Sequence, residues 1–404
     1  MTTRALFLYT DEAGFWSHRA CLARAAQGAG AEVYAMIQRT QPNDETRNAG
    51  LRLIDWRHLS RRSLNPIREF MTLVEVIRVY RNVRPNLVHH FTLKPVIYGG
   101  IAAALCDVEA TVSTIAGLGS LFSRTDLKSR VACRLVKSLL GFVLNRRNSI
   151  TIFQTSEDRE ALVKAGVLPM EKTRLVRGSG VNPEQYIPRP EPEGLPTVIY
   201  ASRLLWSKGV GDFVDACRLL NRRGVNARFV VVGDPDPGNP DSIDLAEVEG
   251  WARDGSVEWW GRSTDMPGTF AHSNVFCYPT YYKEGVPRVL IEASSCARAV
   301  VSTDIPGVHD IVQHGITGLL IPARDVEALA EALQVLINSR ELRIKMGRAG
   351  RQRVISDFSE QIVVSRVTDI YRELLGRRWP PNSDQLATQS RADPRPLPKA
   401  EVFK

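Results

Sequence analysis

The chain of 404 residues has no apolar run as long as the roughly 18–20 residues that a membrane-spanning helix needs. Its first ten residues, MTTRALFLYT, contain a short apolar core followed at once by Asp11 and Glu12, which predicts a first buried strand and not a signal peptide. The six cysteines are scattered, and no two have the spacing of a metal site or a redox pair. These absences favour a protein of the reducing cytoplasm.

The second part of the chain lacks an excess of either charge. Residues 1–150 hold 21 Lys and Arg against 11 Asp and Glu, whereas the rest is nearly balanced, so the whole formal charge of +9 belongs to the N-terminal part. Such asymmetry predicts an anionic partner, either a nucleic acid or a membrane surface. An ordinary solvated basic face explains the count equally well.

Short apolar runs alternate with helical patterns along most of the chain. Strands are expected at 4–9, 31–37, 51–54 and 87–90, and helices at 19–28 and 66–83. Several prolines between 183 and 196 mark a linker, after which a second alternating series begins. The pattern predicts two doubly wound α/β domains, residues 1–185 and 194–356. A terminal helix over 357–378 would pack back on the first domain, and residues 379–404 would form a disordered tail.

Ligands of such sheets bind beyond the carboxyl ends of the strands. Three polar residues of the first domain fall at such ends, and two glycines follow the strand near 111–115. We expect them to line the acceptor side of a cleft: His18, His90, Lys94, Gly117 and Gly119. The two glycines only partly match a dinucleotide fingerprint, because Phe122 takes the third glycine position.

Residues 124–147 predict a helix with two stripes. The apolar stripe consists of Leu127, Val131 and Leu135, and the basic stripe of Arg130, Arg134 and Lys137. This combination is typical of a helix that contacts anionic lipid. A core helix with an ordinary solvated face is the alternative.

Two stretches of the second domain carry charged residues in strand-end loops. ASRLLWSKG places Arg203 and Lys208 where both can reach one diphosphate, although two unrelated surface cations are the simpler interpretation. YPTYYKEGVPRVLIEA, residues 278–293, joins a strand, a loop and a helix start. It carries Glu284 and Glu292, and spacing alone would make them a loop charge and a solvated helix residue. The backbone N–H groups at the helix start suit a phosphate.

The string EGVPRVLIEAS resembles the Glu-x7-Glu motif of retaining glycosyltransferases of family 4. ASRLLWSKG is similar to the Gly-Arg-Leu-x-x-x-Lys-Gly motif of that family, with Ser202 in place of the usual glycine. IPGVHDIV and HGITGLLIP resemble its closing segments. HHFTLKP and AGLGSLF resemble a branch that extends lipid-linked sugars for capsule, O-antigen or glycan synthesis. The resemblance implies a GT-B fold, in which two Rossmann-like domains face a cleft.

The resemblance also implies a hexosyltransferase that uses a nucleotide diphosphate sugar, with a UDP sugar as the expected donor, and retains the anomeric configuration. The site residues carried over are catalytic Glu284 on the sugar, catalytic Arg203 and Lys208 on the diphosphate, Glu292 on the ribose, the backbone of Gly285 and Val286, and Arg262 beside the base. Many members have a histidine near 112–116 that contacts the sugar, where this chain has Ala116.

No metal or other cofactor is expected. Asp234-Pro235-Asp236 spells the Asp-x-Asp of metal-dependent transferases, but it follows an apolar strand and enters a proline-punctuated turn. It resembles instead the Gly-Asp loop of family 4, which binds no metal.

The expected acceptor is a saccharide on polyprenyl diphosphate at the inner face of the plasma membrane, where an anionic surface would meet the basic first domain. No nucleic-acid partner is expected. Two alternatives stay open, namely a nucleotide-sugar epimerase of the same fold and a non-catalytic nucleic-acid-binding protein. The second would explain the basic half but would leave both charged motifs without a role.

Overall fold

The computed structural model describes residues 2–39, 50–60, 65–118 and 127–379, and in the helix that begins at 127 it describes side chains from Cys133 onward. The chain divides into two compact units. The first contains residues 1–114, 142–150 and 364–404, and the second contains residues 115–141 and 151–363. This division places residues 115–141 and 151–185, expected in the N-terminal domain, with the second unit.

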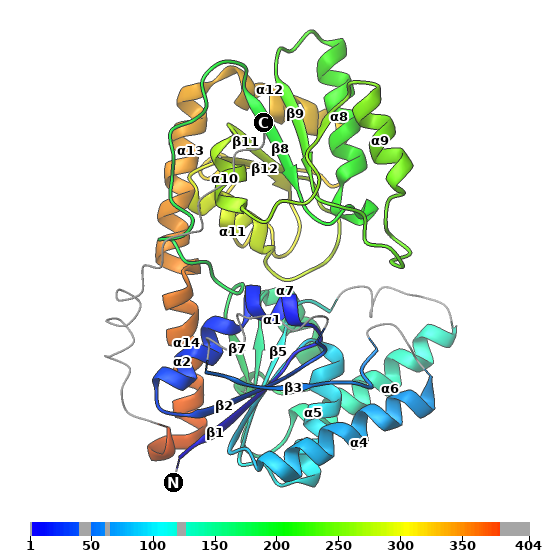
Figure 1. Ribbon diagram of the computed structural model, residues 1–404, viewed down its shortest axis with the longest axis vertical. Coiled ribbons are helices and arrows are strands. Elements are labelled where there is room, and N and C mark those ends of the chain that lie inside the picture. The colour runs from blue at the N-terminus through cyan, green and yellow to red at the C-terminus, as the bar shows by residue number, and fades with distance from the viewer. Residues whose placement is uncertain (1, 40–49, 61–64, 119–126, 380–404) are drawn as a thin grey trace. The chain divides into compact units, whose positions relative to one another are not determined.

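A seven-stranded sheet has the order β3-β2-β1-β4-β5-β6-β7 (Figure 1). Its strands are β1 (Arg4–Leu8), β2 (Glu32–Ile37), β3 (Arg52–Asp55), β4 (Leu87–Phe91), β5 (Ala110–Ile115), β6 (Ser149–Phe153) and β7 (Thr173–Leu175). The helices that alternate with them are α1 (Glu12–His18), α2 (Ala20–Gly28), α4 (Pro66–Val83), α5 (Leu93–Leu105), α6 (Leu127–Leu144) and α7 (Ser156–Lys164). The registered strand pairs are parallel, for example Leu6 of β1 with Val88 of β4.

Alternate residues of the inner strands face opposite sides of this sheet, as the period of a strand requires. Leu6 and Val88 belong to an apolar cluster that includes residues of α4 and α5. His89 faces the other side, where its Nδ1 lies 2.6 Å from the hydroxyl of Tyr371 in α14 (Glu360–Leu375). The first unit therefore has helices on both faces of its strands.

A second, six-stranded sheet has the order β10-β9-β8-β11-β12-β13. Its strands are β8 (Thr197–Ala201), β9 (Arg228–Val232), β10 (Glu258–Trp259), β11 (Val275–Tyr278), β12 (Ala299–Thr303) and β13 (Gly318–Ile321). The helices are α8 (Val210–Arg222), α9 (Leu245–Arg253), α10 (Met266–Ala271), α11 (Arg288–Ser295), α12 (Val326–Asn338) and α13 (Arg340–Arg353). All registered pairs are parallel, and the strands β8, β11 and β12 are buried throughout, as expected for a sheet covered on both faces. The predicted doubly wound α/β class is confirmed.

Three local details concern two helix starts and the end of the described chain. Residues 12–18 form α1, a helix that the apolar pattern did not predict, because the Asp11 carboxylate caps the helix by accepting from the Gly14 N–H over 2.7 Å. Pro287 is the N-cap of α11, whose first helical residue is Arg288. The expected tail lies outside the described residues except for Trp379, which is buried against Tyr371.

Candidate active site

A buried lysine follows the carboxyl end of β8. One 3-10 turn, η3 (Trp206–Lys208), brings Lys208 to 7% exposure. Its Nζ donates to Oε1 of Glu284 over 2.5 Å, and the Tyr278 hydroxyl donates to the same oxygen over 3.0 Å. A buried ammonium group is costly unless it is paired and hydrogen-bonded, and Glu284 provides both. The structure thus brings together two of the predicted catalytic residues.

The charge of Glu284 also affects the pKa of Tyr278. Burial, and then the neighbouring Glu284 carboxylate, raise the pKa of the Tyr278 hydroxyl well above its ordinary value, so this hydroxyl remains a donor. The Lys208 ammonium lies 4.9 Å from the centre of the Tyr282 ring, a favourable position for a cation. Lysine has three N–H donors, and the bond to Glu284 uses one of them. Two remain for acceptors such as phosphate oxygens.

Arg203 lies in the same strand-end loop and is more open to solvent. Its Nη1 donates to Oδ2 of Asp236 over 2.7 Å, and 59% of the Arg203 side chain is exposed. The Asp-x-Asp string therefore supplies an ion pair to the predicted diphosphate-binding arginine. A pair this exposed contributes little to stability. Arg262, predicted beside the base, is also exposed and lies just after β10.

Glu292 is held in a small network within the second unit. It is 8% exposed and accepts hydrogen bonds from the Tyr186 hydroxyl and from Arg288 Nε, each over 2.8 Å. Arg288 also donates to the carbonyl of Gly180 over 2.9 Å. Burial, and then the charge of Glu292, raise the pKa of Tyr186, which keeps its proton. This network fixes the carboxylate on α11, one turn after Arg288, the first residue of that helix.

Glycines allow the backbone to pack tightly around Glu284 and Gly285. The Gly285 N–H donates to the carbonyl of Ala116 over 3.2 Å, so the residue that stands where many family members have a histidine contributes its backbone here. A Cβ added to Gly117, at φ +111°, would lie 2.9 Å from the Gly285 nitrogen. A Cβ added to Gly307, at φ +85°, would overlap the Gly285 carbonyl. Both approaches therefore require glycine.

His90, expected at an accessible strand end, is completely buried. Its Nε2 lies 2.7 Å from the hydroxyl of Tyr80 in α4. Burial, and then the positive charge of Arg146, lower the pKa of His90 to about 3, so the ring is neutral. His90 is thus a core residue of the first unit and not a strand-end ligand, because the side chain points into the sheet–helix interface.

Two of the remaining residues predicted for the acceptor side make contacts within the first unit, and the third lies outside the residues that the structure describes. Lys94 donates to Glu69 over 2.9 Å. His18 ends α1, with its Nδ1 2.6 Å from Oγ of Ser17. Gly119 lies outside the described residues.

The structure describes two of the three side chains of the predicted basic stripe on α6. Arg134 is exposed and Lys137 is half-buried, whereas the side chain of Arg130 lies outside the description. Within the part of the chain that the structure describes, no helix is both long and apolar enough to span a membrane.

Three site residues were not predicted from the sequence. Tyr278 and Tyr186 donate to the two motif glutamates, and Gln154, 4% exposed just after β6, lies against Gly285 where an added Cβ would overlap its side-chain oxygen. The strand-end rule could have indicated Tyr278 and Gln154, because both lie where a buried apolar run ends. Tyr186 could not be recognised in this way, because it lies in a linker and not at the end of an apolar strand.

Comparisons with known proteins agree with this geometry. Residues 5–155 match a family model described as glycosyl transferase 4-like, and residues 195–339 match one described as glycosyl transferases group 1. The chain is 24% identical over 382 residues to the N,N'-diacetylbacillosaminyl-diphospho-undecaprenol alpha-1,3-N-acetylgalactosaminyltransferase of Campylobacter jejuni, covering 91% of this chain and 98% of that protein. It is 23% identical to the UDP-Gal:alpha-D-GlcNAc-diphosphoundecaprenol alpha-1,3-galactosyltransferase of Escherichia coli, covering 78% and 82%.

Solved structures share the fold over almost the whole chain. Sucrose-phosphate synthase from Thermosynechococcus elongatus superposes with a TM-score of 0.76 at 21% identity, covering 93% of this chain and 100% of that one. The Anabaena protein HepE in complex with UDP-glucose superposes with a TM-score of 0.72 at 17% identity, covering 92% and 99%. With the two family matches and the named relatives, this likeness shows that the chain belongs to the family 4 glycosyltransferases of GT-B fold and is a hexosyltransferase.

Proposed function

We propose that this glycosyltransferase moves a sugar from a UDP sugar to a saccharide carried on polyprenyl diphosphate, in the synthesis of a bacterial surface polysaccharide or glycan. The acceptor class is supported by the names of the Campylobacter jejuni and Escherichia coli relatives, both of which state a diphosphoundecaprenol-linked sugar. A Staphylococcus aureus relative, 24% identical, is named as a capsular polysaccharide biosynthesis glycosyltransferase. The name of the Escherichia coli relative includes UDP-Gal, which supports the donor class.

The observation that carries the donor site is the buried Lys208 ammonium held by Glu284 beyond the ends of β8 and β11. Lys208 and Arg203 would stabilise the negative charge that develops on the leaving diphosphate. Glu284, hydrogen-bonded by Tyr278, would orient the sugar hydroxyls as an acceptor of their hydrogen bonds. Glu292, held by Tyr186 and Arg288, would receive the ribose hydroxyls.

Transfer would proceed with retention at the anomeric carbon and without a metal cofactor. The bond from the sugar to the diphosphate breaks while the acceptor oxygen bonds to the same face of the anomeric carbon. The leaving phosphate oxygen takes the proton of the acceptor hydroxyl. In this scheme the cations Lys208 and Arg203 do for the diphosphate what a metal ion does in metal-dependent transferases.

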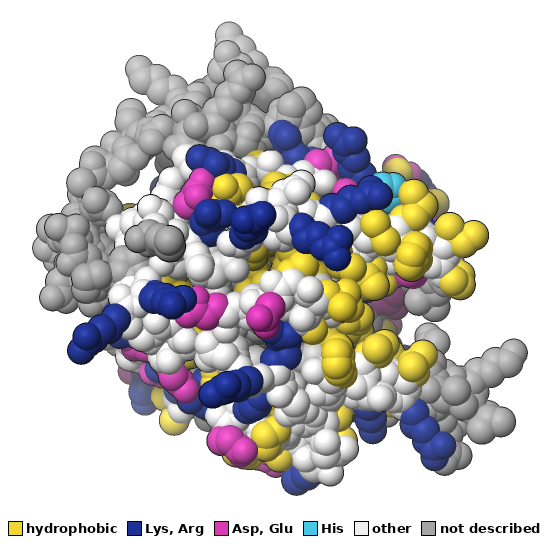
Figure 2. All heavy atoms as spheres, turned by 90° about the horizontal axis from the view of Figure 1, so that it is seen from below, with side chains coloured by type: hydrophobic (Ala, Val, Ile, Leu, Met, Phe, Trp, Pro, Cys, Tyr) yellow, Lys and Arg dark blue, Asp and Glu magenta, His cyan; other side chains and the backbone are white. Residues whose placement is uncertain are grey.

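We further propose that the protein works at the inner face of the plasma membrane, where the basic stripe of α6 and, independently of it, an apolar face of α4 contact lipid. Arg134 is exposed there, and Arg130 and Lys137 complete the stripe in the sequence. On α4, three large apolar side chains of one face are open to solvent, namely Ile67 (73%), Phe70 (66%) and Met71 (44%). Figure 2 shows apolar side chains gathered on one side of the visible face with Lys and Arg side chains beside them. This composition is typical of an interfacial lipid contact.

A donor screen by thermal shift tests the donor site. At a concentration about 100-fold above Kd, a ligand stabilises the folded state by about 2.7 kcal/mol. We expect a UDP sugar to raise Tm in the wild type and to raise it much less in Lys208→Ala. If no nucleotide sugar raises Tm, or if the variant responds as the wild type does, the proposed donor site is wrong.

A further inference from the structure

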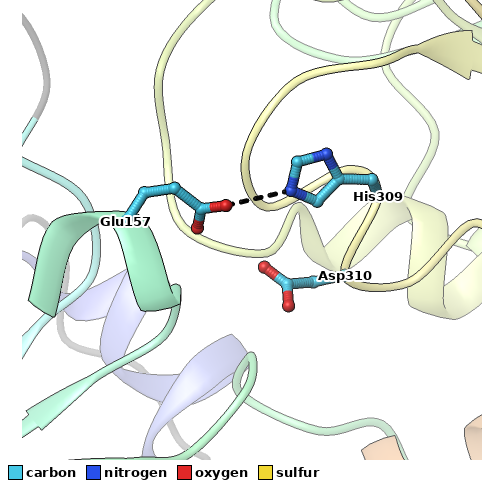
Figure 3. Close-up of side chains that lie close together, drawn as sticks. All are labelled: Glu157, His309 and Asp310. Carbon is cyan, nitrogen blue, oxygen red and sulfur yellow. Dashed lines mark hydrogen bonds and ion pairs between the residues drawn. The ribbon is translucent and has the colours of Figure 1, made fainter. Parts of the chain in front are cut away.

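A second cluster of charged side chains lies within the second unit, where the loop after β12 approaches the start of α7. Glu157 of α7, and His309 and Asp310 of that loop, each offer one ligand atom, and these three atoms lie within 4.8 Å of one another. Figure 3 shows Glu157 and His309 facing each other, with the Asp310 carboxylate beside them. Nε2 of His309 lies 3.2 Å from Oε1 of Glu157.

The orientation of His309 is set by a fourth residue. Nδ1 of His309 lies 3.1 Å from Oδ1 of Asp304, so this nitrogen carries a proton and donates to the carboxylate. Metal-binding histidines in proteins almost always donate their second ring N–H in this way, which fixes the tautomer and leaves the other nitrogen for the metal. Here that other nitrogen, Nε2, faces Glu157. In the hydrogen bond between them a proton lies between Nε2 and the Glu157 carboxylate, and a divalent metal ion would take the place of that proton.

Asp310 supplies an oxygen whose hydrogen-bonding capacity is unused. Its side chain is only 8% exposed, Oδ1 accepts from Arg177 Nε over 2.8 Å, and Oδ2 is buried without a hydrogen-bond partner among the described residues. A buried carboxylate oxygen without a partner is costly. Once a metal ion has replaced the Nε2 proton, the imidazole is neutral, and the carboxylates of Glu157, Asp304 and Asp310 with the guanidinium of Arg177 leave a net charge of −2. A divalent cation matches that charge.

We propose that Glu157, His309 and Asp310 bind a divalent transition-metal ion, and that zinc is the ion they favour. One imidazole and two carboxylates belong to the ligand set of zinc, with bonds of about 2.0–2.2 Å. Manganese and magnesium form weaker complexes with such a nitrogen-containing site. The ligand atoms must draw slightly closer than in the structure, and Glu157, which is exposed, can do so by a change of rotamer.

This ion would have a structural role near the donor loop and no part in the transfer itself. Gly307, two residues before His309, packs against the backbone of Glu284 and Gly285. A metal that joins His309 and Asp310 to α7 would hold Gly307 in that position. The proposal does not depend on which sugar or acceptor the enzyme uses.

Calorimetric titration of the full-length, tag-free protein with zinc tests the site. We expect one ion per chain in the wild type and a loss of more than tenfold in affinity in His309→Ala. Asp304→Asn, which removes only the orienting carboxylate, should lower the affinity for zinc by about 10–100-fold. The matched control is His58→Ala, because His58 also lies beside a carboxylate, that of Glu75 at 3.0 Å, but belongs to no three-ligand cluster among the described residues.

Two further readouts separate this site from adventitious binding. Cobalt, used in place of zinc, should give a spectrum without a thiolate charge-transfer band, since the cluster contains no cysteine. Zinc should raise Tm in the wild type and in His58→Ala but not in His309→Ala. The proposal is overturned if zinc does not bind, if His309→Ala binds it as tightly as the wild type, or if cobalt binds through thiolates.

Discussion

Lys208 and Arg203 share a loop but not an environment. Lys208 is almost buried and bonded to Glu284, whereas Arg203 is mainly exposed and bonded to Asp236. We expect Lys208→Ala and Arg203→Ala each to lower kcat by on the order of 10²–10³, because each removes a group that stabilises charge in the transition state. Steady-state kinetics with a fixed acceptor measure the effect. Near-normal turnover in both variants would remove these residues from the reaction.

Substitutions of Glu284 and Glu292 should affect different steps, sugar transfer in one case and nucleotide binding in the other. Glu284 lies beside Lys208, so Glu284→Gln should chiefly lower the rate of sugar transfer. Glu292 lies within α11 in the network of Tyr186 and Arg288, so Glu292→Gln should chiefly weaken binding of the bare nucleoside diphosphate. Calorimetry with UDP decides between them. A larger loss of UDP affinity in Glu284→Gln would mean that the roles are exchanged.

At the residue scale, the sequence predicted charged motif residues better than their partners. The Lys208–Glu284 contact joins two predicted residues because each follows a neighbouring parallel strand, β8 or β11, at the same sheet edge. Tyr186 could not be predicted, since it reaches Glu292 across 106 positions from a linker without a periodic pattern. His90 was misplaced because strand-end position does not say which face of the sheet a side chain occupies.

At the scale of elements, the loops around Glu284 depend on Gly307. Gly307→Ala should lower stability by at least about 1–2 kcal/mol, because a side chain at positive φ is strained, and should also displace the Gly285 carbonyl. Gly315→Ala is the matched control, since Gly315 has φ +75° but nothing within 4 Å of an added Cβ. Urea unfolding and UDP affinity measure both variants. Equal UDP affinities would show that the Gly307 contact does not shape the donor site.

The exposed face of α4 offers the clearest test of the proposed membrane contact. Ile67→Ser with Phe70→Ser should weaken binding to anionic liposomes at least about tenfold, because burying one large apolar side chain contributes about 1.5–3 kcal/mol. Replacing Arg130, Arg134 and Lys137 by Gln should make the free energy of binding to anionic liposomes less favourable by roughly 3 kcal/mol at most. Ile316→Ser, at a residue 58% exposed and outside both α4 and α6, is the control. Unchanged sedimentation of both variant sets with liposomes would rule out both proposed lipid contacts.

The elements themselves were predicted well where apolar periodicity was strong. α4 spans Pro66–Val83 as expected, because Asn65 caps it and Pro66 suits its first turn. α1 was missed, since it has seven residues and depends on the cap at Asp11 more than on an apolar stripe. The apolar patch on α4 was missed as well, because periodicity marks a face as apolar without saying whether another element covers it.

For the whole molecule, acid should destabilise the fold through its buried histidines. Burial and Arg146 lower the pKa of His90 to about 3, whereas the unfolded chain protonates this ring below about 6.5. The contribution of His90 is therefore complete above pH 6.5 and is lost as the pH falls toward 3. Between pH 6.5 and 5 the loss should be on the order of 2 kcal/mol.

Urea unfolding at pH 7 and pH 5 measures this loss. His90→Asn should be less stable than the wild type at pH 7 but should lose less stability between the two pH values. His314→Asn, at an exposed histidine, should keep the wild-type pH dependence. An unchanged pH dependence in His90→Asn would mean that His90 is not held neutral by the fold.

The most direct test of the proposed function is product analysis with a UDP sugar, in the presence and absence of a polyprenyl-diphosphate-linked saccharide. We expect UDP release to require the acceptor, and the lipid-linked product to gain one sugar with the donor's anomeric configuration. A donor that is converted to another nucleotide sugar without any acceptor would identify an epimerase instead. A product of inverted configuration, or no transfer to any lipid-linked saccharide, would equally contradict the proposed function.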